Sequence, residues 1–276
     1  MNTPPPTSPR LAKNNFDLLR VLFALTVCLV HAHALSGYRE IEWIPTLLSS
    51  EIAVQAFFVV SGFLIFMSYE RSQSLASYAG KRARRIYPAY FTIVMICALG
   101  LWTVSSQGIG EYFSKEWLEY VGFNLVFLNF VQQSLPGVFE NHRFDAVNGA
   151  LWTLKIEVMF YASVPVIVYL CRRLGHLPVI VALYVLSLLY AAAMTWQAQR
   201  TGAEIYLELG RQLPGQLSYF MAGAFLYYFL PLFERRVGYF VALAAAVVLL
   251  RGQLPTGAFE PLALAILVVF FGLYLY

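Results

Sequence analysis

Residues 16–33 read FDLLRVLFALTVCLVHAH, the start of an apolar stretch that continues to Leu35 and contains Arg20 and His31. A membrane-spanning helix needs about 20 such residues. Ten residues separate Arg20 from His31, and eleven positions at about 100° each bring a helix back to within roughly 20° of its starting direction. The two side chains therefore share a face, roughly 16 Å apart along the axis. Ionisable groups at membrane depth usually face a protein interior or a water-filled cavity.

The composition of the whole chain indicates an integral membrane protein. Its 276 residues are 59% hydrophobic and 12% charged, about half the charge of a soluble domain. Long apolar runs exclude a soluble globular domain and predict an all-α, polytopic transmembrane bundle surrounded by a lipid bilayer. No nucleic-acid partner is expected, and nothing indicates an oligomeric state. We expect eight spans, at about 16–36, 50–69, 88–105, 150–170, 177–197, 214–231, 237–251 and 259–276.

The placement of basic residues predicts the orientation. Residues 1–15 (MNTPPPTSPRLAKNN) are polar and Pro-rich, and we expect a disordered cytoplasmic tail rather than a cleavable signal peptide. Basic residues follow spans two, four and six, which puts these connections in the cytoplasm together with the N-terminus. They are Arg71, Lys81, Arg82, Arg84, Arg85, Arg172, Arg173, Arg235 and Arg236.

Segment 117–133 (WLEYVGFNLVFLNFVQQ) is apolar but is not counted as a span. As a ninth span it would place Arg172 and Arg173 outside, against the distribution of basic residues. We therefore expect an interfacial or re-entrant helix on the outer side.

Polar residues on the first span allow two interpretations. Asp17 and Arg20 have the i,i+3 spacing of a helical ion pair. Arg20 is either an ordinary snorkelling arginine or a functional cation, and His31 is either a hydrogen-bonded packing residue or a titratable functional group. His33 points about 200° away from His31 and is expected at the interface.

The segment KRARRIYP (81–88) is the densest cluster of charge, and we expect a cytoplasmic loop with Pro88 in the first turn of span three. It is either a topological signal and lipid-headgroup patch, or a site where Arg82 and Arg85 present guanidinium groups to phosphates. In span two, Ser61-Gly62 favours a helix-packing notch over a nucleophile, because no nucleophile-elbow motif surrounds it.

Glu157 lies in the fourth span, in NGALWTLKIEVMFY, about seven residues or roughly 10 Å below the outer surface. His31 is expected at a similar depth. A carboxylate beside an imidazole orients it and raises its basicity, as expected of a general base. Lys155 points about 200° away from Glu157 and is interpreted as an anchor.

Four segments, in order, resemble the membrane-bound acyltransferase-3 family. Each motif alone is degenerate, but together they extend from residue 16 to about 230. They are FDLLRVLFALTVCLVHAH (16–33), VQAFFVVSGFLIF (54–66), RARRIYP (82–88) and NGALWTLKIEVMFYASVP (148–165), with LSYFMAGAFLYYF (217–229) as a looser match.

The resemblance implies transfer of an acyl group, often acetyl, from cytoplasmic acyl-CoA to a hydroxyl of an extracytoplasmic glycan. Cell-surface polysaccharide and lipopolysaccharide O-antigen are typical acceptors, the membrane is the bacterial inner membrane, and no metal is implied. By resemblance, His31 is the catalytic histidine and Glu157 the acidic residue of the Trp-x-x-x-x-Glu segment. Arg82 and Arg85 would meet the CoA phosphates together with Arg20, the basic residue paired with His31.

Two departures from the family accompany the resemblance. Ala53 stands where the family often has Gly, and the usual final two spans are missing, so we expect either a fragment or a naturally short chain. The alternative function is a proton-coupled transporter or flippase, with His31 and Glu157 as a proton relay. The sequence lacks the internal repeat with broken spans that this alternative predicts. A non-catalytic scaffold would leave the ionisable residues at depth unexplained.

Overall fold

The computed structural model describes residues 8–142 and 144–275, and the regular secondary structure of this part of the chain is helical, with no strand. The all-α prediction is therefore confirmed. The chain forms two compact units, unit 1 (Met1–Ser72 and Phe160–Tyr276) and unit 2 (Gln73–Met159). Residues 1–7 of the expected disordered tail lie outside the described residues.

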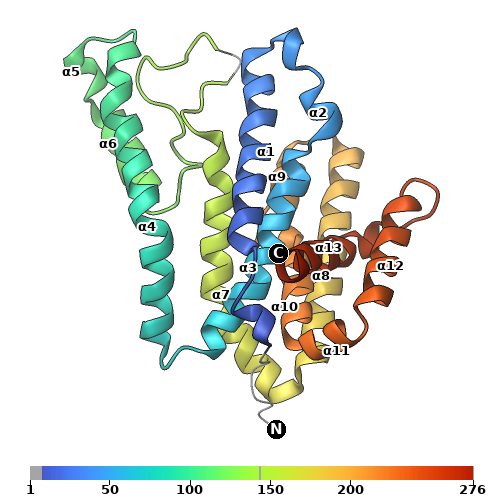
Figure 1. The fold of residues 1–276 in the computed structure, drawn as a ribbon. Helices are drawn as coiled ribbons and strands as arrows, with labels where there is room; N and C mark the ends of the chain where they lie inside the picture. Colours follow the sequence, from blue (N-terminus) through green and yellow to red (C-terminus); the bar gives the residue numbers. More distant parts are fainter. Residues whose placement is uncertain (1–7, 143, 276) are drawn as a thin grey trace. The chain divides into compact units, whose positions relative to one another are not determined.

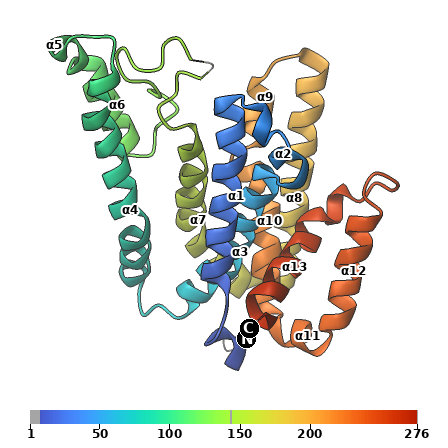
Figure 2. The same cartoon turned by 45° about the horizontal axis from the view of Figure 1, so that its top comes forward.

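Most of the helices belong to unit 1 (Figures 1 and 2). They are α1 (Phe16–Ser36), α2 (Ile44–Leu47), α3 (Ser50–Glu70), the later part of α7 (Trp152–Leu174), α8 (His176–Thr201), α9 (Ile205–Gly210), α10 (Leu213–Tyr228), α11 (Leu230–Arg235), α12 (Val237–Leu249) and α13 (Glu260–Tyr274). Unit 2 holds α4 (Leu75–Gly100), α5 (Ile109–Tyr112), α6 (Lys115–Leu125) and the start of α7.

The expected spans correspond to helices. Among the described residues, six helical segments are long and apolar enough to cross a membrane. They contain α1, α3, α4, α7, α8 and α13, which match six of the eight predicted spans. The other two, α10 with 16 residues and α12 with 13, are shorter helices at the predicted positions.

The third span begins earlier than predicted. α4 starts at Leu75, where the Ser74 hydroxyl accepts a hydrogen bond from the Ser77 amide at 3.1 Å. Segment 81–88 is therefore helical rather than a loop, and Pro88 lies inside α4 instead of in its first turn. Proline removes one backbone donor, but the helix continues across it. The 26 residues of α4 extend about 39 Å, longer than the roughly 30 Å hydrocarbon core.

Segment 117–133 is helical only in its first half. α6 ends at Leu125, where the buried Asn124 side chain donates to the carbonyls of Tyr120 at 2.8 Å and Gln132 at 3.0 Å. These bonds fold the chain back on itself, and Phe127 adopts a positive φ of 63°. With 11 residues, or about 16 Å, α6 is too short to cross the hydrocarbon core.

The centre of unit 1 is a close contact between α3 and α10. A Cβ atom at Gly62 of α3 would overlap the carbonyl oxygen of Phe220, and one at Gly223 of α10 would overlap the carbonyl oxygen of Val59. The two glycines therefore let the two backbones touch. Ser61 is only 6% exposed beside this contact, which confirms the packing-notch interpretation of Ser61-Gly62.

Stacked aromatic rings extend this contact to α7. The Phe220 ring lies 4.7 Å from that of Phe58 and 3.9 Å from that of Phe160. Figures 1 and 2 show α3 among α1, α10 and α13, all of which contact it. The position of α1 in unit 1 thus depends on α3.

A polar cluster joins one end of α3, α7, α8 and α10. Glu70 Oε2 pairs with Arg172 Nη2 at 2.8 Å, and the Tyr228 hydroxyl donates to Glu70 Oε1 at 3.0 Å. The His176 ring lies 4.2 Å from the Tyr228 ring. These contacts place the connections after α3, α7 and α10 at one end of unit 1, as the alternation of basic residues predicts.

The residues before α1 contact the C-terminal helices of the same unit. The Ser8 hydroxyl donates to Glu234 Oε1 at 2.7 Å, and the Arg10 guanidinium lies 3.8 Å from the centre of the Tyr274 ring. The Asn15 amide donates to a carbonyl of α13 at 2.8 Å. Residues 8–15 are thus held against α11 and α13.

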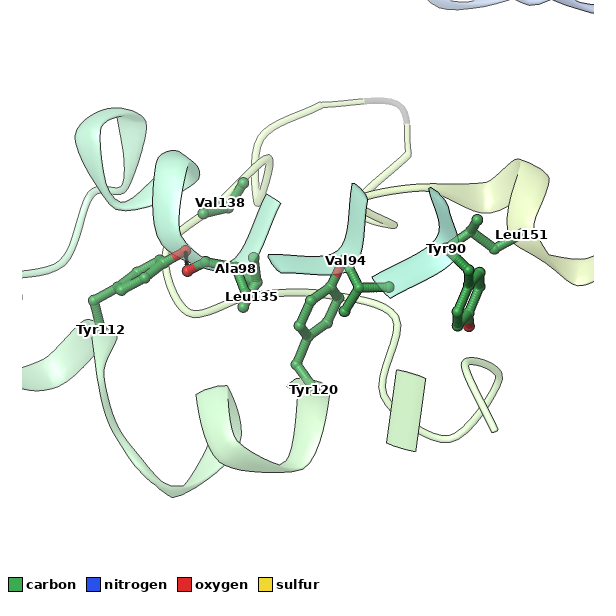
Figure 3. Close-up of a cluster of buried hydrophobic side chains, with 8 residues drawn as sticks. All are labelled: Tyr90, Val94, Ala98, Tyr112, Tyr120, Leu135, Val138 and Leu151. Atoms are coloured by element: carbon green, nitrogen blue, oxygen red, sulfur yellow. Dashed lines mark hydrogen bonds between the residues drawn. The ribbon is translucent and has the colours of Figure 1, made fainter. Parts of the chain in front are cut away.

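Unit 2 has a hydrophobic core of its own (Figure 3). The Ala98 carbonyl on α4 accepts hydrogen bonds from the Tyr112 hydroxyl at 3.0 Å and from Trp117 Nε1 at 2.7 Å. Burial raises the pKa of Tyr112 above its ordinary value. The buried members are Tyr90, Val94, Ala98, Tyr112, Tyr120, Leu135, Val138 and Leu151.

Replacing Gly62 by alanine should lower the melting temperature of the detergent-solubilised protein, because the added methyl forces α3 and α10 apart. Overpacking of this kind costs about 1–3 kcal/mol. Gly238→Ala is the matched control, since a Cβ at Gly238 on α12 meets no atom within 4 Å. Equal melting temperatures for the two variants would contradict the close contact.

The Glu70–Arg172 pair should stabilise unit 1 modestly, because half of the Arg172 side chain, 50%, is exposed. A double-mutant cycle with Glu70→Gln and Arg172→Ala should give a coupling of about 1 kcal/mol in the free energy of unfolding. The comparison pair is Arg211–Glu208, whose side chains are 59% and 58% exposed. A coupling no larger than that of the comparison pair would argue against the polar cluster.

Candidate functional site

Arg20 lies on the first turns of α1 and is mostly buried. Its Nη1 pairs with Asp17 Oδ1 at 2.7 Å, which confirms the predicted i,i+3 ion pair. The Arg20 side chain is 18% exposed, whereas that of Asp17 is 94% exposed. An ion pair with so exposed a partner contributes little to stability.

His31 lies eleven positions after Arg20 on the same unbroken helix, with its side chain exposed. Its Nδ1 is 2.8 Å from the carbonyl oxygen of Val27, one turn earlier. A carbonyl oxygen only accepts hydrogen bonds, so Nδ1 carries the proton of the neutral ring and Nε2 carries the lone pair. The local helix geometry therefore leaves Nε2 as the atom that can take up a proton.

His33 has a different environment. It is half-buried, and its Nδ1 is buried without a hydrogen-bond partner among the residues that the structure describes. His31 is thus the more accessible of the two imidazoles.

Arg82 and Arg85 lie one turn apart on α4, in unit 2. Arg82 is half-buried and Arg85 is exposed, as is Arg84 between them. The spacing of three residues puts Arg82 and Arg85 on one side of a regular helix. The pair is therefore presented by a helix and not by the loop predicted from the sequence.

Glu157 is half-buried on α7, five positions after Trp152. It belongs to unit 2, and α7 continues into unit 1 from Phe160. The Lys155 ammonium lies 4.5 Å from the centre of the Phe130 ring, a cation–π contact that fits its interpretation as an anchor. Glu157 belongs to unit 2 and His31 to unit 1, and each unit is described by itself. The expected proximity of the two residues therefore stays a prediction.

The structure adds polar groups that sequence reasoning missed. Arg172 was interpreted only as a topological marker, yet it pairs with Glu70, 102 positions away.

At the opposite end of unit 1, a cavity of about 210 Å³ lies among α3, α10, α12 and α13. No group of three or more His, Cys, Asp or Glu side chains in the described ranges could hold a metal ion.

Comparison with known proteins shows that the chain is similar to a nodulation protein and to an O-acetyl transferase. The chain is 33% identical to nodulation protein 10 of Rhizobium leguminosarum bv. viciae over 170 residues, 58% of this chain and 46% of that protein. It is 34% identical to an O-acetyl transferase of Shigella phage Sf6 over 153 residues, 54% of this chain and 44% of that protein. The matched regions thus span about half the length of these relatives. No solved structure matches.

The family assignment rests on a longer match. Residues 13–276 match an acyltransferase domain, the acyltransferase-3 family. This match contains all four segments whose order carried the resemblance, and it includes both units. The apolar helices agree with a multi-pass membrane protein. The chain therefore belongs to the acyltransferase-3 family of membrane proteins.

Proposed function

We propose that the chain transfers an acyl group, in the first instance acetyl, from cytoplasmic acyl-CoA to a hydroxyl of an extracytoplasmic glycan. The observation that carries this proposal is the hydrogen bond between His31 Nδ1 and the Val27 carbonyl, which leaves Nε2 as a proton acceptor. The similarity to a phage protein named O-acetyl transferase supports the choice of acetyl and of an oxygen acceptor.

The chemical step needs one base and one leaving group. His31 Nε2 removes the proton of the acceptor hydroxyl as its oxygen attacks the thioester carbonyl, forming the new ester C–O bond. The C–S bond then breaks, and the CoA thiolate takes the proton from the imidazolium. A variant in which His31 carries the acyl group transiently uses the same nitrogen. Glu157 is not needed to set the tautomer, because Val27 does so; it would balance the imidazolium charge or hold the acceptor.

The donor side would involve the arginines. Arg82 and Arg85, one turn apart on α4, fit recognition of the CoA phosphates by paired guanidinium groups. Arg20 would neutralise a further phosphate, and the pantetheine arm would follow the roughly 16 Å between Arg20 and His31 along α1. The basic residues around Arg172 support placing this end of unit 1 in the cytoplasm, with the acceptor on the other side of the inner membrane.

Replacing His31 by alanine should abolish acylation, a loss of at least about 100-fold, because the general base disappears. O-acetylation of surface glycans, measured by mass spectrometry, is the readout, with membrane abundance of the protein as the folding check. His33→Ala on the same helix is the control. Normal acetylation in the His31 variant would refute the assignment, and loss of the whole glycan in cells without the protein would favour a flippase.

Replacing Arg82 and Arg85 together by alanine should raise the KM for acyl-CoA by about tenfold or more, because each charge-assisted hydrogen bond to phosphate contributes about 1.5–3 kcal/mol. The KM for the acceptor should not change. The control is Arg84→Ala, which lies on the same turns of α4 and is exposed like Arg85. An unchanged KM for acyl-CoA in the double variant would show that these arginines do not bind the donor and act only as a topological signal.

A further inference from the structure

A cavity of about 210 Å³ opens in unit 1 at the end opposite to the Glu70–Arg172 pair. It lies near the start of α3, where Gln55 lines it, and beside the first half of α10, where Tyr219 does. Arg251, in the α12–α13 connection, lines it as well. In the orientation proposed above, this is the extracytoplasmic end of the unit.

The polar side chains of the cavity come from three helices and the α12–α13 connection. Arg251 Nε pairs with Glu260 Oε1 at 3.1 Å, and both residues line the cavity. Gln55 Nε2 donates to Glu51 Oε1 at 3.2 Å, which leaves the Gln55 carbonyl oxygen as an acceptor. Tyr219 lies within electrostatic range of Glu51, Glu260 and Arg251. Donors and acceptors of several kinds thus surround one small space.

The rest of the cavity wall is apolar. It comes mostly from α12 and α13, which include Val248 and Leu264, together with Ile52 of α3. An apolar wall facing a polar rim suits a ligand that has one C–H face and several hydroxyl groups. A sugar ring has this character.

The charges at the rim exclude other occupants. The two charged lining residues, Arg251 and Glu260, pair with each other and leave no net charge, and the carboxylate of Glu51 beside Gln55 adds a negative charge nearby. A charged ligand would lose its hydration there without gaining an unpaired counter-charge in the lining. A fatty chain would cover the Arg251–Glu260 pair and Gln55 without replacing their hydration, which is costly. A neutral polyol can hydrogen-bond to all of them.

We infer that this cavity binds a neutral sugar ring. The ring places its hydroxyl groups on Gln55, Tyr219 and Glu260 and its C–H face against Val248 and Leu264. Its role as an acceptor subsite rests on the proposed function, but the binding itself does not.

The test is saturation-transfer NMR on the purified full chain in detergent micelles. The probes are glucose, galactose, rhamnose and N-acetylglucosamine, with galacturonic acid as a charged comparison. The wild-type protein should bind at least one neutral sugar and bind galacturonic acid more weakly. Gln55→Leu combined with Glu260→Gln should lower the affinity roughly tenfold, because hydrogen bonds to charged groups are lost.

The control is Glu208→Gln, which changes an exposed ion pair with Arg211 and does not line the cavity. This variant should bind like the wild type. Val248→Phe should also weaken binding by filling the cavity without removing a polar group, and its exposed position, 54%, favours normal folding. No transfer to any neutral sugar, or equal transfer in all variants, overturns the inference.

His31→Ala separates the two proposals. Sugar binding retained in His31→Ala, with acylation lost, is the expected result. Acylation that depends on His31 but not on Gln55, Glu260 or Val248 would refute the role of the cavity as an acceptor subsite and leave the proposed function standing. Sugar binding without any acylation by the wild type would refute the proposed function alone.

Discussion

The backbone contact between α3 and α10 at Gly62 and Gly223 is the constraint on which unit 1 depends. Lipid tails are as apolar as leucine, so helices in a bilayer gain little from burying apolar side chains and associate through close packing instead. α3 in turn contacts α1 and α13, and α10 contacts α8 and α13. The helix that carries Arg20 and His31 therefore takes its place from a contact that involves neither residue.

The tautomer of the proposed base, His31, is set by its own helix. His31 meets the carbonyl of Val27 one turn earlier, so its tautomer needs no partner from another element. Arg20 lies on the same face by helical periodicity. A single helix thus carries the proposed proton acceptor and a cation, eleven positions apart. The proposed roles of Glu157, Arg82 and Arg85 are to select and hold what reacts there.

The sequence predicted the helices better than their ends. Six of the eight expected spans are long apolar helices, because uninterrupted apolar length is a local property. The errors lie where polar groups decide a boundary. Ser74 caps α4 well before the arginine cluster. Segment 81–88 is therefore helical, although its high charge had indicated a loop. The buried Asn124 ends α6 through a carbonyl eight positions later, a bond that no hydropathy pattern contains.

The sequence by itself determined the all-α membrane fold, the shared face of Arg20 and His31, and the family, because spans and motifs are read within single segments. Only the tertiary structure decided which distant polar groups meet. Glu70 pairs with Arg172 across 102 positions, and the proposed sugar cavity joins Gln55, Tyr219 and Glu260 from three helices. These neighbours depend on how helices pack, which the glycines of α3 and α10 decide through close approach of two backbones.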